Sequence, residues 1–254
     1  MVFDFTGTCP QVDAPINVPY NSLLATVFYS LKALIGTDIP SNAGIYRTFN
    51  VVAPKGCLVN STHPAPVGVM IDTCQRLPDV IFGALAPAVP ERIIAGCNSA
   101  CTTAVFTGVD PRNKDSVFIY HEAIAGGSGA SKHADGLSAV QVHMTNTSNM
   151  PVEALEFEFP LITIKKYALR KDSGGAGEYR GGLGIQREFE IVSDGVSYTG
   201  LGDRQKFCPW GLEGGSDGYG GAYYLHAVDG AVTHLPSKCT GLPVKKGDMI
   251  EVLT

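Results

Sequence analysis

Two stretches in the first part of the chain carry apolar residues at the spacing of an α-helix. Residues 23–34 have apolar side chains recurring every three or four positions, and either Asn21 or Ser22 can cap the start of this helix. Residues 68–83 show the same period, with charged and amide side chains on the face opposite the apolar one. Pro78 lies within this second stretch, so it should kink the helix or mark its first turn.

Strand patterns fill much of the remaining chain. Before residue 170 they are short apolar or alternating runs at residues 2–5, 46–53, 92–95, 116–125, 140–145 and 163–169. After residue 170 the chain is strand-like throughout, and fifteen of the thirty glycines fall between residues 174 and 221. The predicted fold class is α+β. A mixed α/β part over residues 1–160 holds the candidate pocket residues, and a glycine-rich, mostly antiparallel β part follows over residues 161–254.

The densest glycine stretch is residues 173–184, in which six of twelve residues are glycine. A phosphate-binding loop would be followed by a helix and would carry Lys-Ser/Thr after its last glycine, but Gly184 precedes Ile-Gln-Arg. Residues 185–192 instead alternate with a period of two, and Asp194-Gly195 predicts a β-hairpin with residues 196–199. The glycine stretch is therefore either a structural bend or a loop that faces a substrate or a partner. A second Asp-Gly pair predicts another hairpin, between residues 223–228 and 232–235.

Composition and charge exclude several classes of protein. The 254 residues are 44% hydrophobic and 17% charged, which indicates extensive burial and favours contacts with other subunits. A net charge of −5, with no basic run longer than two residues, gives no basis for binding nucleic acid or an anionic membrane. The sequence has no run of about eighteen apolar residues that would span a membrane.

Seven cysteines, an odd number, in a chain without a recognisable signal peptide predict a reducing cytoplasmic location. Cys97 and Cys101 have the wrong spacing for a typical zinc-binding pair, and no second pair follows. We interpret these two residues as buried thiols, with a zinc site as the alternative.

Glu122 is the first candidate for acid–base chemistry, because it lies near the end of an apolar strand and before a glycine loop. A buried carboxylate needs a partner, a metal ion or a proton, so Glu122 is either a general acid/base or a paired structural carboxylate. His121-Glu122 is not a zinc-protease motif, since position 125 is alanine where the second histidine would fall.

The segment His143-Met-Thr-Asn-Thr147 is the second candidate, with an imidazole, two hydroxyls and a carboxamide at the end of a predicted strand. If that strand persists, His143, Thr145 and Thr147 lie on one face; alternatively, the hydroxyls cap a turn. Asp72 and Arg76 are four residues apart on the second predicted helix, which is typical of a surface ion pair.

Several of these segments together resemble one family, the hydantoinase B / 5-oxoprolinase / acetone and acetophenone carboxylase group. The matching pieces run nearly from end to end: Asp4-Phe-Thr-Gly7, Pro15-Ile-Asn17, Asp38-Ile-Pro-Ser-Asn-Ala-Gly44, Thr73 with Gln75-Arg76, Tyr120 with Glu122 and Gly126-Gly127, His143-Met-Thr-Asn-Thr147, Pro151 with Glu153-Ala-Leu-Glu156, Asp172-Ser-Gly-Gly-Ala-Gly177, Arg180-Gly-Gly-Leu-Gly184, and Pro209-Trp-Gly-Leu212. Many relatives have Tyr-Tyr-Glu where this chain has Tyr120-His121-Glu122, a change that could alter the pocket.

The resemblance implies an ATP-dependent enzyme that opens cyclic amides such as hydantoin or 5-oxoproline, or one that carboxylates ketones. It implies a partner subunit of the hydantoinase A type that binds ATP and Mg²⁺. It covers only the second half of the family's chain. The half with the His/Asp-rich site for a divalent metal (Zn, Mn or Fe) has no counterpart here, so we expect either a split enzyme or a fragment, with the metal bound by another polypeptide and no metal ligand in this chain.

The leading hypothesis is a non-ATP-binding piece of an ATP-dependent cyclic-amide hydrolase. The alternatives are a ketone carboxylase subunit and a non-catalytic scaffold that docks the ATPase. The expected catalytic residues are Glu122, His143 and Asn146, and the expected substrate-binding residues are Thr145, Thr147, Gly126, Gly127, Gln75 and Arg76. Gly126 and Gly127 would let backbone N–H groups approach an oxyanion or a phosphorylated oxygen.

Overall fold

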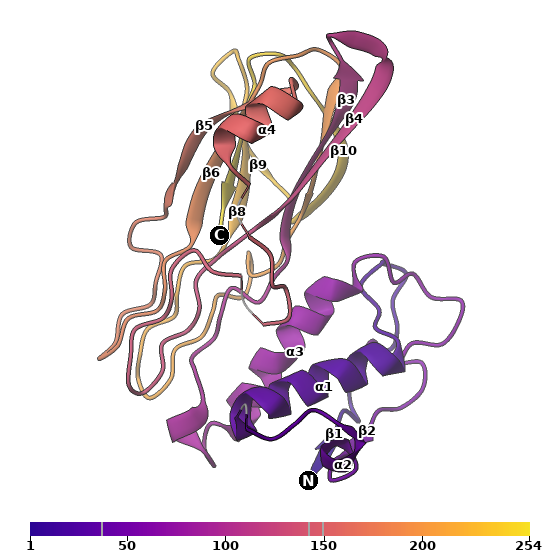
Figure 1. Cartoon of the computed structure of the whole chain (residues 1–254), viewed down its shortest axis with the longest axis vertical. Coiled ribbons are helices and arrows are strands. Elements are labelled where there is room, and N and C mark those ends of the chain that lie inside the picture. The colour runs from indigo at the N-terminus through magenta and orange to yellow at the C-terminus, as the bar shows by residue number, and fades with distance from the viewer. Residues whose placement is uncertain (37, 142, 149) are drawn as a thin grey trace. The chain divides into compact units, whose positions relative to one another are not determined.

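Two units divide the chain, Met1–Ile93 and Ile94–Thr254 (Figure 1). The computed structural model describes residues 1–36, 38–141, 143–148 and 150–254, and for Lys114 and Asp115 it describes the backbone alone. The fold is α+β, as predicted. The boundary predicted between residues 160 and 161 falls inside the second unit, because strands from both sides of it pack there around one core.

The first unit is built on two helices, α1 (Tyr20–Ile35) and α3 (Met70–Leu85), which pack against each other. Leu23, Val27 and Leu31 recur every fourth residue of α1 and are buried, as the sequence pattern predicts. Helix α3 continues through Pro78, which therefore lies in the helix interior and not in its first turn.

Two of the strands predicted before residue 96 are largely absent from the described residues. Within residues 46–53 only β2 (Asn50–Val52) is extended, and it pairs in parallel with β1 (Val2–Asp4). Tyr46 instead ends the short helix α2 (Ala43–Tyr46), whose first turn is capped by the Asn42 side chain, which accepts from the Gly44 N–H at 2.8 Å. In place of the strand predicted over residues 92–95, a 3₁₀ helix η1 (Pro90–Arg92) begins at a proline, whose fixed φ suits a first helical position.

The second unit is a pair of antiparallel sheets whose inner faces meet (Figure 1). The four-stranded sheet has the order β10-β7-β3-β4, with strands β3 (Thr102–Asp110), β4 (Asn113–Ile124), β7 (Val196–Leu201) and β10 (Lys238–Val244). The five-stranded sheet has the order β5-β6-β11-β8-β9, with strands β5 (Ile162–Leu169), β6 (Ile185–Ile191), β8 (Ala222–His226), β9 (Val232–Leu235) and β11 (Met249–Leu253). Phe106 links the two layers, since its ring centroid lies 5.2 Å from that of Tyr198 in its own sheet and 5.0 Å from that of Phe189 in the other.

The hairpin predicted at Asp194-Gly195 does not form. Strand β6 pairs with β5 and β11, whereas β7 pairs with β3 and β10, so the turn carries the chain from one sheet to the other. The hairpin predicted between residues 223–228 and 232–235 is confirmed as β8 and β9. Among the described residues, no helix is long and apolar enough to cross a membrane.

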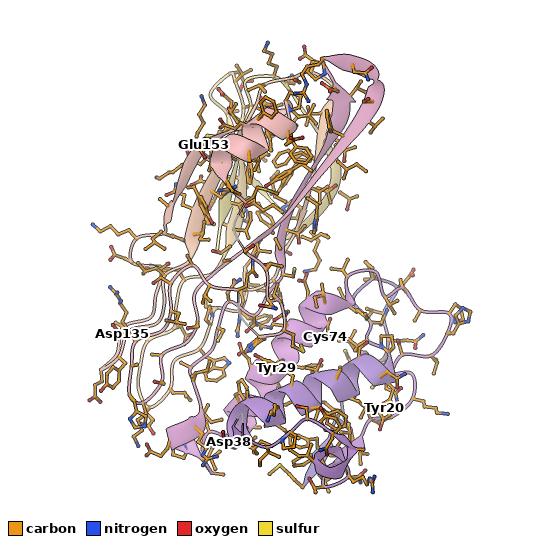
Figure 2. All side chains as sticks on the ribbon, in the orientation of Figure 1. Tyr20, Tyr29, Asp38, Cys74, Asp135 and Glu153 are labelled. Atoms are coloured by element: carbon orange, nitrogen blue, oxygen red, sulfur yellow. The ribbon has the colours of Figure 1, made fainter. Side chains whose placement is uncertain are left out.

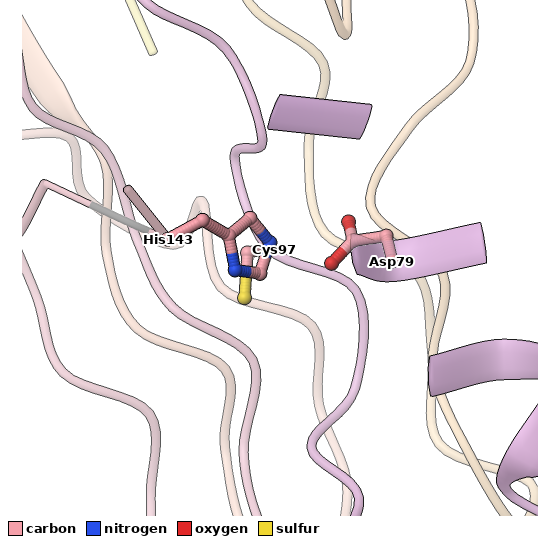
Figure 3. Close-up of side chains that lie close together, drawn as sticks. All are labelled: Asp79, Cys97 and His143. Carbon is pink, nitrogen blue, oxygen red and sulfur yellow. The ribbon is translucent and has the colours of Figure 1, made fainter. Parts of the chain in front are cut away.

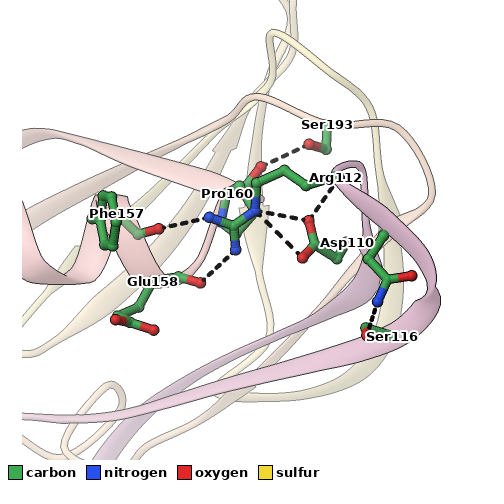
Figure 4. Close-up of polar contacts among 8 residues, drawn as sticks. Asp110, Arg112, Ser116, Phe157, Glu158, Pro160 and Ser193 are labelled. Carbon is green, nitrogen blue, oxygen red and sulfur yellow. Dashed lines mark hydrogen bonds and ion pairs between the residues drawn. The ribbon is translucent and has the colours of Figure 1, made fainter.

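Helix α4 (Val152–Glu158) ends at an arginine from the turn between β3 and β4 (Figure 4). Arg112 donates to the carbonyl oxygens of Phe157 at 3.1 Å and Glu158 at 3.3 Å, and its Nε lies 3.1 Å from Asp110 Oδ1. The last carbonyls of a helix have no intrahelical partner, so a donated hydrogen bond stabilises this end.

The glycine-rich segments of the second unit run side by side as extended chains (Figure 1). A Cβ atom added at Gly127 would lie 2.1 Å from the Gly182 carbonyl oxygen, and one at Gly182 would lie 2.0 Å from that of Leu137. A Cβ at Gly175 would lie 2.1 Å from the oxygen of Ser216. These glycines are therefore required by backbone-to-backbone packing. We call residues 126–138, 173–184 and 211–218 the glycine array.

Candidate functional site

Glu122 lies on β4 and accepts hydrogen bonds from two side chains of the second unit. Arg187 Nη2 is 3.0 Å from one carboxylate oxygen and 3.1 Å from the other. The Tyr120 hydroxyl donates to the same carboxylate at 2.8 Å. Burial, reinforced by the Glu122 carboxylate, raises the pKa of Tyr120 well above its ordinary value, so this phenol stays protonated and keeps donating. Figure 2 shows how densely side chains fill the space between the sheets.

Arg187 is fully buried in the sheet pair, with its guanidinium 4.0 Å from the centre of the Tyr167 ring. A signal for this residue exists in the sequence, although Arg187 is not among the predicted site residues. Side chains of a strand point alternately to its two faces, and Arg187 lies an even number of residues from Ile185, Phe189 and Ile191. The sequence pattern therefore places a charged residue on the inner face of β6. An arginine at such a position needs a buried counter-charge, and Glu122 supplies it.

This pairing bears on the two alternatives left open for Glu122. A general acid/base has to reach an atom of the substrate, whereas the carboxylate oxygens of Glu122 are engaged within the fold by a guanidinium and a phenol. The geometry therefore favours the paired structural carboxylate.

His143 lies in a turn, contrary to the strand predicted over residues 140–145. His143 has φ of 54° and Asn146 has φ of 47°, and these left-handed conformations break an extended chain. The prediction that His143, Thr145 and Thr147 lie on one face of a strand is therefore wrong. Val142, also within the predicted strand, lies outside the described residues. His143 and Thr145 are half-buried, whereas Asn146 and Thr147 are exposed.

The turn brings His143 next to Cys97 (Figure 3). It also brings His143 next to Ser99. A ring nitrogen of His143 lies within 4.8 Å of Cys97 Sγ, and Ser99 Oγ is 3.5 Å from His143 Nε2. Ser99 is buried and has φ of 42°, a strained conformation that clusters at functional sites. Asp79, also drawn in Figure 3, is a buried residue of α3 in the first unit.

Gly126 and Gly127 border this cluster, but their main contacts are structural. The Gly126 N–H donates to the Val140 carbonyl at 3.3 Å, and the Gly127 carbonyl accepts from the Asn98 N–H at 3.0 Å. A Cβ on Gly126 would lie 2.5 Å from the Asn98 side chain. The Gly126 N–H is thus engaged within the fold and is not available to bind the oxyanion of a substrate.

Gln75 and Arg76 belong to helix α3 of the first unit. Gln75 is fully buried, and Asp72, expected in a surface ion pair with Arg76, is buried as well. These burials exclude a solvent-exposed pair at this position. The substrate contacts expected for Gln75 and Arg76 stay predictions.

Comparisons with known proteins point to one family over the whole chain. The profile described as Hydantoinase B/oxoprolinase matches residues 1–254. The uncharacterized protein MJ0963 of Methanocaldococcus jannaschii is 41% identical over 99% of this chain, and the B-type subunit of a putative D-/L-hydantoinase from a Pseudomonas species is 33% identical over 100% of it. In both cases the chain spans 43% of the relative's length.

Two solved structures share the fold. The ATP-dependent caprolactamase of Pseudomonas jessenii is 28% identical, with a TM-score of 0.82 over 96% of this chain and 44% of its own. A nucleotide-free acetone carboxylase is 17% identical, with a TM-score of 0.80 over 100% of this chain and 38% of its own. At that identity the second likeness shows the fold alone.

Proposed function

Because the chain belongs to the Hydantoinase B/oxoprolinase family, we propose that it is part of the hydantoinase B-type subunit of an ATP-dependent cyclic-amide hydrolase. The observation that carries this proposal is the likeness to an ATP-dependent caprolactamase, since caprolactam is itself a cyclic amide. The acetone carboxylase supports the fold but, at 17% identity, says less about the reaction.

The rest of the activity is proposed to come from other polypeptide segments. The chain spans less than half of the relatives described above, and one of them is named as a hydantoinase subunit. We assign ATP and Mg²⁺ to a hydantoinase A-type partner, and the family's divalent metal to the polypeptide that carries the N-terminal half. We also propose a reducing, cytoplasmic setting, in keeping with the odd number of cysteines in the sequence.

In this proposal His143 and Asn146 act on the substrate, and Thr145 and Thr147 bind it. Ring opening joins a water oxygen to the carbonyl carbon and breaks the C–N bond, and the leaving nitrogen then takes up a proton. His143 is half-buried, and histidine is the side chain that most often performs such a proton transfer in enzymes. The exposed Asn146 amide can donate to the developing oxyanion. Glu122 is assigned a structural role by its pairing with Arg187.

The test is turnover by the purified complex with hydantoin, 5-oxoproline, and a ketone with bicarbonate. Ring opening with ATP consumption supports the proposal, whereas ketone carboxylation would show that the chain belongs to a ketone carboxylase instead. His143→Ala should lower kcat by a factor of about 10²–10⁴, the usual contribution of one acid–base group. His121→Ala, an exposed histidine on β4, is the matched control. If His143→Ala and Glu122→Gln both leave turnover per assembled complex unchanged, the chain is a scaffold.

A further inference from the structure

Cys97 and His143 are far apart in sequence, yet the second unit brings a thiol and an imidazole together. The Cys97 sulfur lies within 4.8 Å of a His143 ring nitrogen (Figure 3). Thiolate sulfur and imidazole nitrogen are the two ligand types that Zn²⁺ prefers. We propose that Cys97 and His143 bind a soft divalent cation of the Zn²⁺ class.

The sulfur atom is held in place by its surroundings. The Gly129 N–H donates to Cys97 Sγ at 3.3 Å, which fixes the position of the sulfur. The buried side chain of Arg204 donates from Nε to the Cys97 carbonyl at 3.1 Å and so fixes the backbone. Glycine is required at position 129, because a Cβ there would lie 1.9 Å from the Ala95 carbonyl oxygen.

The imidazole is held by a strained turn and a neighbouring hydroxyl. His143 adopts φ of 54°, a conformation that a non-glycine residue keeps only where its surroundings enforce it. Ser99, itself at φ of 42°, places its Oγ 3.5 Å from His143 Nε2. A hydroxyl there can orient the ring as an outer partner, as is usual around metal-binding histidines.

Two protein ligands leave coordination positions open to water or substrate, a feature of catalytic more than of structural zinc sites. A ring nitrogen of His143 that binds a cation cannot also deliver a proton, so the cation site is an alternative to the proton-donor role proposed above. Metal binding is measured on this chain alone, so the two roles can be tested separately. The cation site also differs from the Cys97–Cys101 pair considered from the sequence: the second ligand comes from a distant turn.

The experiment is a Co²⁺ titration of the full chain under reducing conditions after treatment with a chelator, followed by displacement with Zn²⁺. The expected result is one equivalent bound, with the near-ultraviolet charge-transfer band of a thiolate ligand. Cys97→Ser should abolish the band, and His143→Ala should weaken binding by about tenfold or more. Ser99→Ala should weaken it by about 10–100-fold while the band remains.

Cys239→Ser and His226→Ala are the matched controls, a half-buried cysteine of β10 and a half-buried histidine of β8, and both should bind as wild type. Circular dichroism checks that each variant is folded. If Cys97→Ser fails to fold, the Co²⁺ affinities of His143→Ala and Ser99→Ala test the proposal in its place. The proposal is overturned if the chain binds no Co²⁺, if the bound ion shows no thiolate band, or if folded His143→Ala binds as tightly as wild type.

Discussion

Arg187 and Glu122 form an ion pair inside the sheet pair, with Nη2 at 3.0 Å and 3.1 Å from the two carboxylate oxygens. The arginine side chain is fully buried and that of Glu122 is 11% exposed. Two charges have therefore been removed from water, and each depends on the other for compensation.

Glu122→Gln should lower the free energy of unfolding by about 3–5 kcal/mol, because it leaves a buried guanidinium without its counter-charge. Adding Arg187→Met should recover part of this loss, since the double variant contains no unpaired charge. Urea unfolding of both single variants and the double variant gives the coupling energy.

The matched control for this cycle is Glu190→Gln. Lys165 and Glu190 are 2.8 Å apart, and their side chains are 52% and 31% exposed, so loss of this pair should cost less than about 1 kcal/mol. If the changes in the free energy of unfolding caused by Glu122→Gln and Arg187→Met simply add in the double variant, the two residues are not coupled. That result would contradict the interpretation that each charge compensates the other.

Gly182→Ala should destabilise the glycine array by at least about 1–3 kcal/mol, the usual cost of overpacking, because its Cβ would lie 2.0 Å from a backbone oxygen that cannot rotate away. Gly68→Ala is the control, since its Cβ would meet only the Pro15 side chain at 3.8 Å. Thermal unfolding measures both variants. Equal melting temperatures for the two would mean that the array tolerates side chains.

The protein should lose stability as the pH rises above 10, the ordinary pKa of tyrosine. Burial raises the pKa of Tyr198 far above that value, so above pH 10 the unfolded chain releases a proton that the folded chain retains. Tyr198 thus contributes stability that is complete below pH 10 and is lost with rising pH, by about 1.4 kcal/mol per pH unit. Urea unfolding between pH 9 and 11 measures the slope.

Tyr198→Phe should reduce that slope and change stability by less than about 1 kcal/mol at pH 7. The Tyr198 hydroxyl is buried and, among the described residues, has no hydrogen-bond partner, so its removal breaks no hydrogen bond. An unchanged slope in the variant would show that other groups cause the alkaline loss.

Arg112→Gln should loosen the end of α4, because two carbonyl oxygens lose their donor. Hydrogen exchange should become faster at the amides of the last turn of α4 and stay unchanged in β6. Arg180→Gln, an exposed arginine of the glycine array, is the control. Uniformly faster exchange across the second unit would instead indicate global destabilisation.

Elements whose burial follows one simple period were predictable from the sequence. The alternation of β6 and the helical spacing of α1 each reflect one buried face, and both elements form within a few residues of the predicted bounds. The turn at Asp194-Gly195 shows the limit of such patterns. Local turn chemistry indicates that the chain reverses, but not that its two strands join different sheets.

The candidate site was less predictable because its contacts are not local. The partner of Glu122 comes from β6 and that of Cys97 from a turn near residue 143, and no local spacing links these residues. The number of glycines is visible in the sequence, but the oxygen atoms that they approach belong to other segments. Left-handed φ at His143 likewise has no signal in its neighbours.

Trp210 is the only tryptophan of the chain, and its carbonyl accepts from the Gly96 N–H at 2.9 Å beside the glycine array. A Cβ on Gly96 would lie 2.7 Å from the backbone nitrogen of Trp210 and 3.2 Å from its indole ring. Fluorescence excited selectively at tryptophan therefore comes from this one place. The fluorescence of Trp210 can therefore report on the ordering of the glycine array, while far-ultraviolet circular dichroism reports separately on the sheets.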